Sequence, residues 1–134
     1  SFIGAEATEQ LYEAFKSNIV DIRVTVVSAL ANIVAEHGKE RCGQVFMEAL
    51  EDEAMEVRLE AIAALSHLPP QFALPHLIPL LENSNSELVR AAILSLGKLG
   101  ADEALPHLRA HEEGEMAPIA KIAISQIESV SEGE

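Results

Sequence analysis

Apolar and polar residues alternate along this chain with the period of an α-helix, and the same pattern occurs in four copies. Each copy opens with an acidic residue and then an aliphatic residue or Met, which we call the anchor of that copy. The four anchors are Ile22, Val57, Leu88 and Met116. Apolar or small residues follow 4, 7, 8 and 11 positions after each anchor, so they share one stripe of an α-helix. The pattern predicts four amphipathic helices, which we call the second helices.

A shorter apolar segment precedes each anchor and predicts a partner helix, which we call the first helix of a hairpin. The segments Ala73–Leu77 and Ala104–Leu108 are identical and lie 31 positions apart. We expect Ser84 and Gly100 to mark the start and the end of the third of the second helices. The repeats are predicted at about 5–37, 39–69, 70–100 and 102–130, in one domain over 1–134 with a disordered tail at 131–134.

The starts of the second helices resemble HEAT repeats, and the resemblance covers nearly the whole chain. The matching motifs are Asp21–Arg23, Glu56–Arg58 and Glu87–Arg90. In the third motif the Arg is displaced by one position, and in the fourth copy Ala117 stands where an Arg is expected. The resemblance implies an all-α fold, a right-handed α-α superhelix (solenoid) of four HEAT-like helical hairpins.

A finer resemblance comes from the end of the third copy and the start of the fourth. Leu96–Ala101 followed by Ala104–Leu108 is similar to the bacterial and archaeal branch of phycobilisome-lyase-like HEAT repeats. This implies a prokaryotic, cytoplasmic protein. Because HEAT arrays serve mostly as binding scaffolds, the resemblance also implies a protein-binding role.

The charge balance narrows the range of partners. The 134 residues include 22 Asp and Glu but only 9 Lys and Arg, a net charge of −13. Such a surface repels nucleic acid and anionic lipid, so we expect neither as a partner. The residues Ala61–Leu81 contain no charged side chain, but Pro69 and Pro70 interrupt them, which favours two short helices over a membrane span. Six acidic residues fall on expected loops and either attract a basic partner or form a solvated edge: Glu51, Asp52, Glu53, Glu112, Glu113 and Glu115.

One row of residues on the second helices points away from the apolar stripe. It occupies positions 2 and 6 after each anchor, where an exposed helix is normally charged, yet most of its residues are small or apolar. By the resemblance to HEAT arrays, this row lines a concave groove that holds a partner helix or an extended peptide. The predicted partner-binding residues are Val24, Ser28, Leu59, Ala63, Arg90, Leu94, Lys98 and Ile122. The alternative is that part of this row packs between adjacent repeats, as we expect of Val27, Ile62 and Ile93.

The sequence offers little for catalysis. Cys42 has no suggestive partner, and no serine lies in a nucleophile motif. His107 and His111 lie four positions apart on an expected helix, a two-ligand metal geometry without a recognisable third ligand. We therefore predict no catalytic residue, no metal site and no cofactor.

The function predicted from the sequence is a non-catalytic scaffold that presents a concave helical surface to a partner protein or peptide. The alternatives are a phycobilin-lyase-like chromophore attachment factor and a metal-binding HEAT protein that uses His107 and His111. The last second helix carries apolar residues on more than one side. Either it packs in a homodimer or further repeats follow it.

Overall fold

The computed structural model describes residues 9–37 and 40–133, without the side chains of 34–43 and 133, in two compact units, Ser1–Leu68 and Pro69–Glu134. All regular elements in the described residues are helices. The first unit contains helical residues 9–14, α2 (Val20–His37), α3 (Glu40–Leu50) and α4 (Met55–Leu65). The second contains α5 (Pro70–Leu77), the 3-10 helix η1 (Ile78–Glu82), α6 (Ser86–Leu99), the 3-10 helix η2 (Asp102–Ala104), α7 (Leu105–Arg109) and α8 (Ala117–Gly133).

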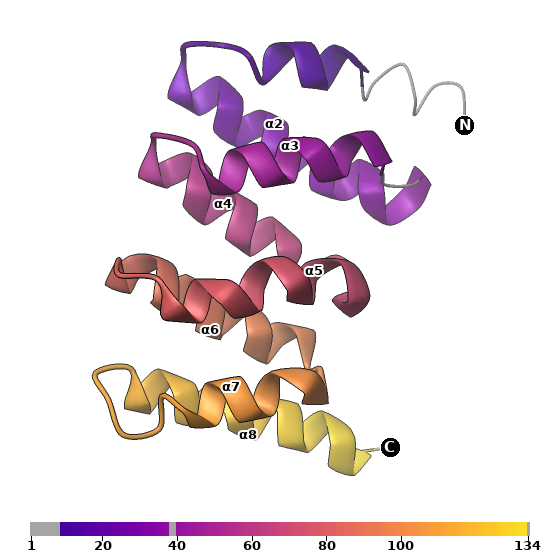
Figure 1. Cartoon of the computed structure of the whole chain (residues 1–134). Coiled ribbons are helices and arrows are strands. Elements are labelled where there is room, and N and C mark those ends of the chain that lie inside the picture. The colour runs from indigo at the N-terminus through magenta and orange to yellow at the C-terminus, as the bar shows by residue number, and fades with distance from the viewer. Residues whose placement is uncertain (1–8, 38–39, 134) are drawn as a thin grey trace. The chain divides into compact units, whose positions relative to one another are not determined.

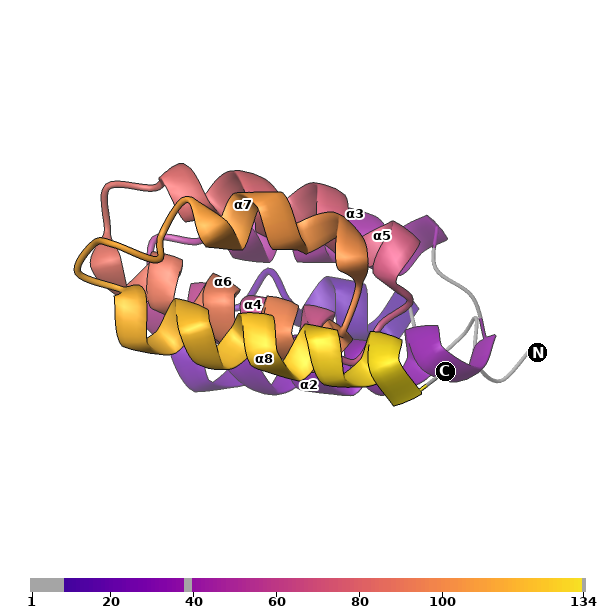
Figure 2. The same cartoon turned by 90° about the horizontal axis from the view of Figure 1, so that it is seen from below.

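The helices pair as hairpins, as the repeated pattern predicts, and the all-α fold is confirmed (Figure 1). In the first unit, α3 lies on one side and the second helices α2 and α4 form the other layer. In the second unit, α5 and α7 form one layer and the second helices α6 and α8 the other (Figure 2). The single domain over 1–134 stays a prediction, because each unit is compact by itself.

Prolines lie in both first helices of the second unit, inside α5 and at the start of η1 and α7. Pro75 and Pro79 remove two backbone donors, and the α-helix gives way to η1 at Ile78. Pro106 lies in the first turn of α7, where a missing N–H costs little. The uncharged stretch Ala61–Leu81 likewise breaks between α4 and α5. Among the described residues, no helix has both the length and the apolar character that crossing a membrane requires.

The core follows the predicted stripe. At 4 positions after the anchors, Val26, Ala61, Ala92 and Ala120 are all at most 3% exposed. At 8 positions, Leu30, Leu65, Leu96 and Ile124 are at most 5% exposed. Ile22 departs from the pattern, since 39% of it is exposed. Ile22 belongs to the first copy, and no hairpin precedes that copy among the described residues to cover this anchor.

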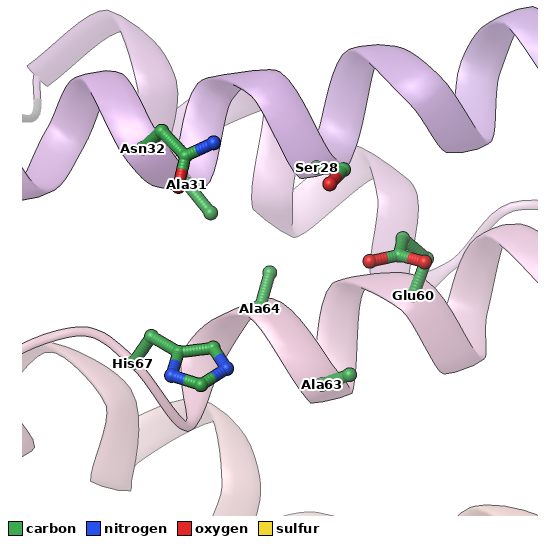
Figure 3. A pocket seen from close by; sticks show the side chains of 7 residues that line it. All are labelled: Ser28, Ala31, Asn32, Glu60, Ala63, Ala64 and His67. Carbon is green, nitrogen blue, oxygen red and sulfur yellow. The ribbon is translucent and has the colours of Figure 1, made fainter.

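Small residues bring neighbouring second helices close together. A Cβ added to Gly97 of α6 would lie 3.1 Å from both Cα and Cβ of Ala123 on α8, and it would also meet Oε1 of Gln126. Gly97 lies 9 positions after its anchor and Ala123 lies 7 positions after its own. The same positions hold Ala31 and Ala64 in the first unit, where Figure 3 shows the two methyl groups pointing toward each other. Helix backbones approach closely only where such residues meet.

Of the two predicted caps of α6, one is confirmed and one is wrong. Gly100 ends α6 in the left-handed conformation, with φ of 68°, which confirms it as the cap. The start of α6 differs from expectation, because the N-cap is Asn85 and not Ser84. Its side chain accepts a hydrogen bond from the Glu87 N–H at 2.9 Å, while Asn83 accepts one from the Asn85 N–H at 2.8 Å.

Helix α8 extends through residues that the sequence assigns to a tail. It continues to Gly133, and the Ser131 hydroxyl donates a hydrogen bond to the Asp102 carboxylate at 2.5 Å. This contact and the helical hydrogen bonds give residues 131–133 a defined structure.

A buried ion pair links the first two hairpins. The Arg23 guanidinium donates to the Asp52 carboxylate through Nε and Nη2 at 2.9 and 3.0 Å, and through Nη1 to the Ser17 carbonyl at 2.8 Å. Only 9% of each charged side chain is exposed. Burial opposes ionisation of Asp52, but hydrogen bonds from Arg23 and the Ala54 N–H, with the charges of Arg23 and Arg58, hold the pKa of Asp52 below its ordinary value. The Asp52 carboxylate therefore belongs to the fold, and it is not one of the loop acids free to attract a partner.

We expect Gly97→Leu to destabilise the protein by about 2 kcal/mol, because the added side chain would force α6 and α8 apart. Urea unfolding followed by circular dichroism measures this. Gly114→Leu is the control, because a Cβ at Gly114 meets nothing within 4 Å. Equal stability of the Gly97 variant and the wild type would contradict the close approach.

We expect Asp52→Asn to cost about 3 kcal/mol, because it leaves the buried charge of Arg23 without its partner. A carboxyl group with a lowered pKa in the folded state contributes stability above its unfolded pKa of about 3.9 and loses it as the pH falls further. Thermal unfolding from pH 7 to pH 3 should therefore show a steeper acid loss in the wild type than in the variant.

The control is Lys16→Gln, which removes the exposed Lys16–Glu13 pair, whose side chains are 61% and 66% exposed. It should change the unfolding free energy by less than about 0.5 kcal/mol. An Asp52→Asn variant that behaves like this control would show that the buried pair contributes little.

Candidate partner-binding surface

The first unit carries the first half of the predicted row. Val24 and Leu59 are half-buried at the surface of α2 and α4, and Ser28 and Ala63 are exposed one turn further along. By contrast Val27 and Ile62, expected to pack between repeats, are at most 1% exposed. The row is therefore a surface in this unit, distinct from the buried positions beside it.

A hollow of about 260 Å³ lies between α2 and the end of α4. Its lining residues are Ser28, Ala31, Asn32, Glu60, Ala63, Ala64 and His67 (Figure 3). It exists because Ala31 and Ala64 face each other with nothing larger than a methyl group. The predicted residues Ser28 and Ala63 thus line one hollow, whereas Val24 and Leu59 do not.

Polar groups surround the small-residue floor of this hollow. Figure 3 shows Glu60 near Ser28 at one end, with Asn32 and His67 toward the other. These side chains offer a carboxylate, a hydroxyl, an amide and an imidazole, so they can both donate and accept hydrogen bonds. A floor of methyl groups lets a partner backbone approach closely.

The second unit carries the other half of the row on α6 and α8, which pack against each other. Leu94 and Ile122 both lie 6 positions after their anchors, and they are 45% and 58% exposed. Arg90 and Lys98 lie one turn before and one turn after Leu94, and both are exposed. Two large apolar side chains beside two positive charges form a surface that can bury apolar groups of a partner.

Of the seven lining residues, only Ser28 and Ala63 are in the predicted set; the sequence missed Ala31 and Ala64 and three polar residues, Asn32, Glu60 and His67. Asn32 and His67 lie 10 positions after their anchors, as Lys98 does. Extending the row by one helical turn in every copy would have found both. Glu60 lies beside the row, and no repeated position indicates it.

The two candidate metal ligands do not share a helix. Helix α7 ends at Arg109, so His107 is helical while His111 lies in the turn that follows, where its N–H bonds to the Leu108 carbonyl at 2.9 Å. The expected two-ligand geometry on one helix face is therefore wrong, because α7 ends at Arg109, before it reaches His111. Within the described residues, no group of three or more His, Cys, Asp or Glu is placed to hold a metal ion. The Cys42 side chain lies outside the described residues.

The outer face of α8 differs from the equivalent faces of the other second helices. Lys121 and Ser125 occupy the positions that hold the buried residues Ile93 and Gly97 in α6, and both are exposed. The apolar residues that predict a two-sided helix are Ile119, Ile122, Ile127 and Val130; Ile127 is buried, Ile119 is half-buried, and Ile122 and Val130 are exposed. A homodimer through α8 stays a prediction.

A family model described as HEAT repeats matches residues 43–126. No curated protein matches the chain.

Proposed function

This chain belongs to the HEAT-repeat family, and from that premise we propose that it is a non-catalytic scaffold that binds a partner protein or peptide through its second helices. HEAT repeats commonly act as protein-interaction scaffolds. The observation that carries the proposal is the exposure of Leu94 and Ile122 at the same repeat position of two packed helices. These side chains contribute little to the core of the second unit, and a partner would bury them.

The energy of this contact comes mainly from apolar burial. Leu94 and Ile122 each keep about half of their surface in water, so covering each contributes about 1 kcal/mol. Arg90 and Lys98 would orient a partner that carries an acidic residue near its apolar side chain. On the first unit, the hollow between α2 and α4 would accept a segment of extended backbone, with the Ser28 hydroxyl donating a hydrogen bond to its carbonyl groups and the Glu60 carboxylate accepting one from its N–H groups.

The proposal includes the finer predictions from the sequence. The partner-binding residues are Val24, Ser28, Leu59, Ala63, Arg90, Leu94, Lys98 and Ile122. Membership of the phycobilisome-lyase-like branch, a prokaryotic origin and a cytoplasmic location rest on the motifs at 96–101 and 104–108. Neither Phe nor Tyr lines the hollow between α2 and α4, so this hollow does not favour chromophore attachment.

A random peptide library displayed on phage, selected on the wild-type protein, tests the surface even while the natural partner is unidentified. We expect Leu94→Glu combined with Ile122→Glu to weaken the selected peptides by about thirtyfold in Kd, which corresponds to the loss of about 2 kcal/mol of apolar burial. Fluorescence anisotropy with labelled peptides measures the change.

Met47→Glu is the matched control, because Met47 on α3 is 58% exposed, as Ile122 is, but lies outside the row. It also adds a negative charge, so it separates loss of the row from a general electrostatic effect. If the peptides bind the double variant as tightly as the control, the proposed surface is wrong.

A further inference from the structure

In the first unit, the Arg23 guanidinium lies between Ser17 and Asp52, and we call this place the arginine slot. Its three residues occupy fixed positions of the repeat. Arg23 lies 1 position after its anchor Ile22, and the Ser17 carbonyl that it contacts lies 5 positions before that anchor. Asp52 lies 5 positions before the next anchor, Val57. The guanidinium therefore sits between the loops that lead into two successive second helices.

In the second unit, the repeat positions equivalent to the arginine slot hold no arginine. Val89 lies 1 position after the anchor Leu88, and Asn83 lies 5 positions before it. His111 lies 5 positions before the next anchor, Met116. The loops 83–85 and 110–116 lead into α6 and α8 on the same side of this unit (Figure 1).

The structure contains a hollow of about 300 Å³ at these positions. Asn83, Val89 and His111 all line it, which is the equivalent of the Ser17, Arg23 and Asp52 arrangement. A single water needs only ~15 Å³ of such space, so the hollow accepts a side chain. Replacement of the long arginine by the short Val89 accounts for the space.

The remaining lining combines negative charge with an apolar base. Glu82 and Glu115 are exposed at the hollow, whereas Leu81, which also lines it, is only 3% exposed. Met116 adds a second apolar side chain. Carboxylates match the planar donor groups of a guanidinium, and apolar side chains match the methylene stem that carries it.

We propose that this hollow is a binding site for an arginine side chain of a partner protein, which takes the place that Arg23 fills in the first unit. Glu82 and Glu115 supply the charge, His111 and Asn83 supply further acceptors, and Leu81 and Met116 cover the stem. A guanidinium fits better than an ammonium, because its several donors in one plane reach acceptors on both loops at once. The site lies at the loop end of α6 and α8 and shares no residue with the partner-binding row, so it stands or fails independently of the proposed function.

Titration of ¹⁵N-labelled protein with N-acetyl-arginine amide tests the site with a defined probe. We expect saturable chemical-shift changes at the amides of residues 82–86 and 111–116. N-acetyl-citrulline amide has almost the same shape without the charge and should cause no comparable changes. N-acetyl-lysine amide should bind more weakly than the arginine derivative. Equal binding of the citrulline derivative, or shifts that map elsewhere, would overturn the proposal.

Glu82→Gln and Glu115→Gln test the charge on exposed residues that the fold does not need. Each should weaken binding of the arginine derivative on the order of threefold, and the two together by about tenfold. Glu103→Gln is the control, because Glu103 is an exposed glutamate on η2 and does not line the hollow. Unchanged affinity in the Glu82→Gln, Glu115→Gln double variant would rule the site out.

Val89→Arg provides a second test. It places an arginine of this chain at the repeat position that Arg23 occupies in the first unit, and this side chain should fill the hollow itself. The folded variant should no longer bind the arginine derivative, whereas Val89→Leu should retain binding. Full binding by a folded Val89→Arg variant would contradict the equivalence of the two slots. If Val89→Arg does not fold, the glutamate variants decide the question.

Discussion

The close approach of neighbouring second helices through small side chains is the constraint on which the rest of the structure depends. Gly97 against Ala123 sets the spacing of α6 and α8, and Ala31 faces Ala64 between α2 and α4. Because these side chains are small, the helix backbones approach closely, and the larger stripe residues are buried on one side. On the other side, the same small residues leave the helices with a shallow, accessible surface. Core packing and the hollow between α2 and α4 thus depend on small residues at the same repeat positions.

The copies of the repeat differ at a few equivalent positions, and the distinctive features of this chain lie at those positions. Where the first copy has Arg23 between two loops, the third has Val89, and a buried ion pair is replaced by a hollow. Where α6 has the buried residue Ile93, α8 has the exposed Lys121. An array of identical hairpins would bind the same way along its length. Substitution at single repeat positions gives each hairpin its own chemistry.

The sequence predicted the helices well because burial within a hairpin repeats with the helical period. The stripe residues, the Gly100 cap and the exposure of Leu94 and Ile122 all follow from spacing along one helix. Contacts between hairpins were harder to predict. In the sequence, Asp52 is one of several acidic residues in a loop. Its neighbours in the sequence do not show that it pairs with Arg23, which lies 29 positions away. The sequence predicts the N-cap of α6 at Ser84, one residue before the observed Asn85. Asn83, Ser84 and Asn85 are all residue types that cap helices, and only the geometry of the turn selects Asn85. Glu60 lies at no repeated position of the pattern, so only the packed pair of α2 and α4 shows that it lines the hollow.

Methyl NMR of the protein in complex with a peptide selected on it tests most directly whether the second helices form the binding surface, since it reports contact residue by residue. The protein, labelled at its Ala, Ile, Leu and Met methyl groups, carries probes on both layers of each unit. We expect the largest shift changes on binding at the second helices, at Leu94 and Ile122 or at Ala63, while Met47 on α3 does not move. Shift changes confined to α3, α5 and α7, with the second helices unaffected, would contradict a binding surface on the second helices.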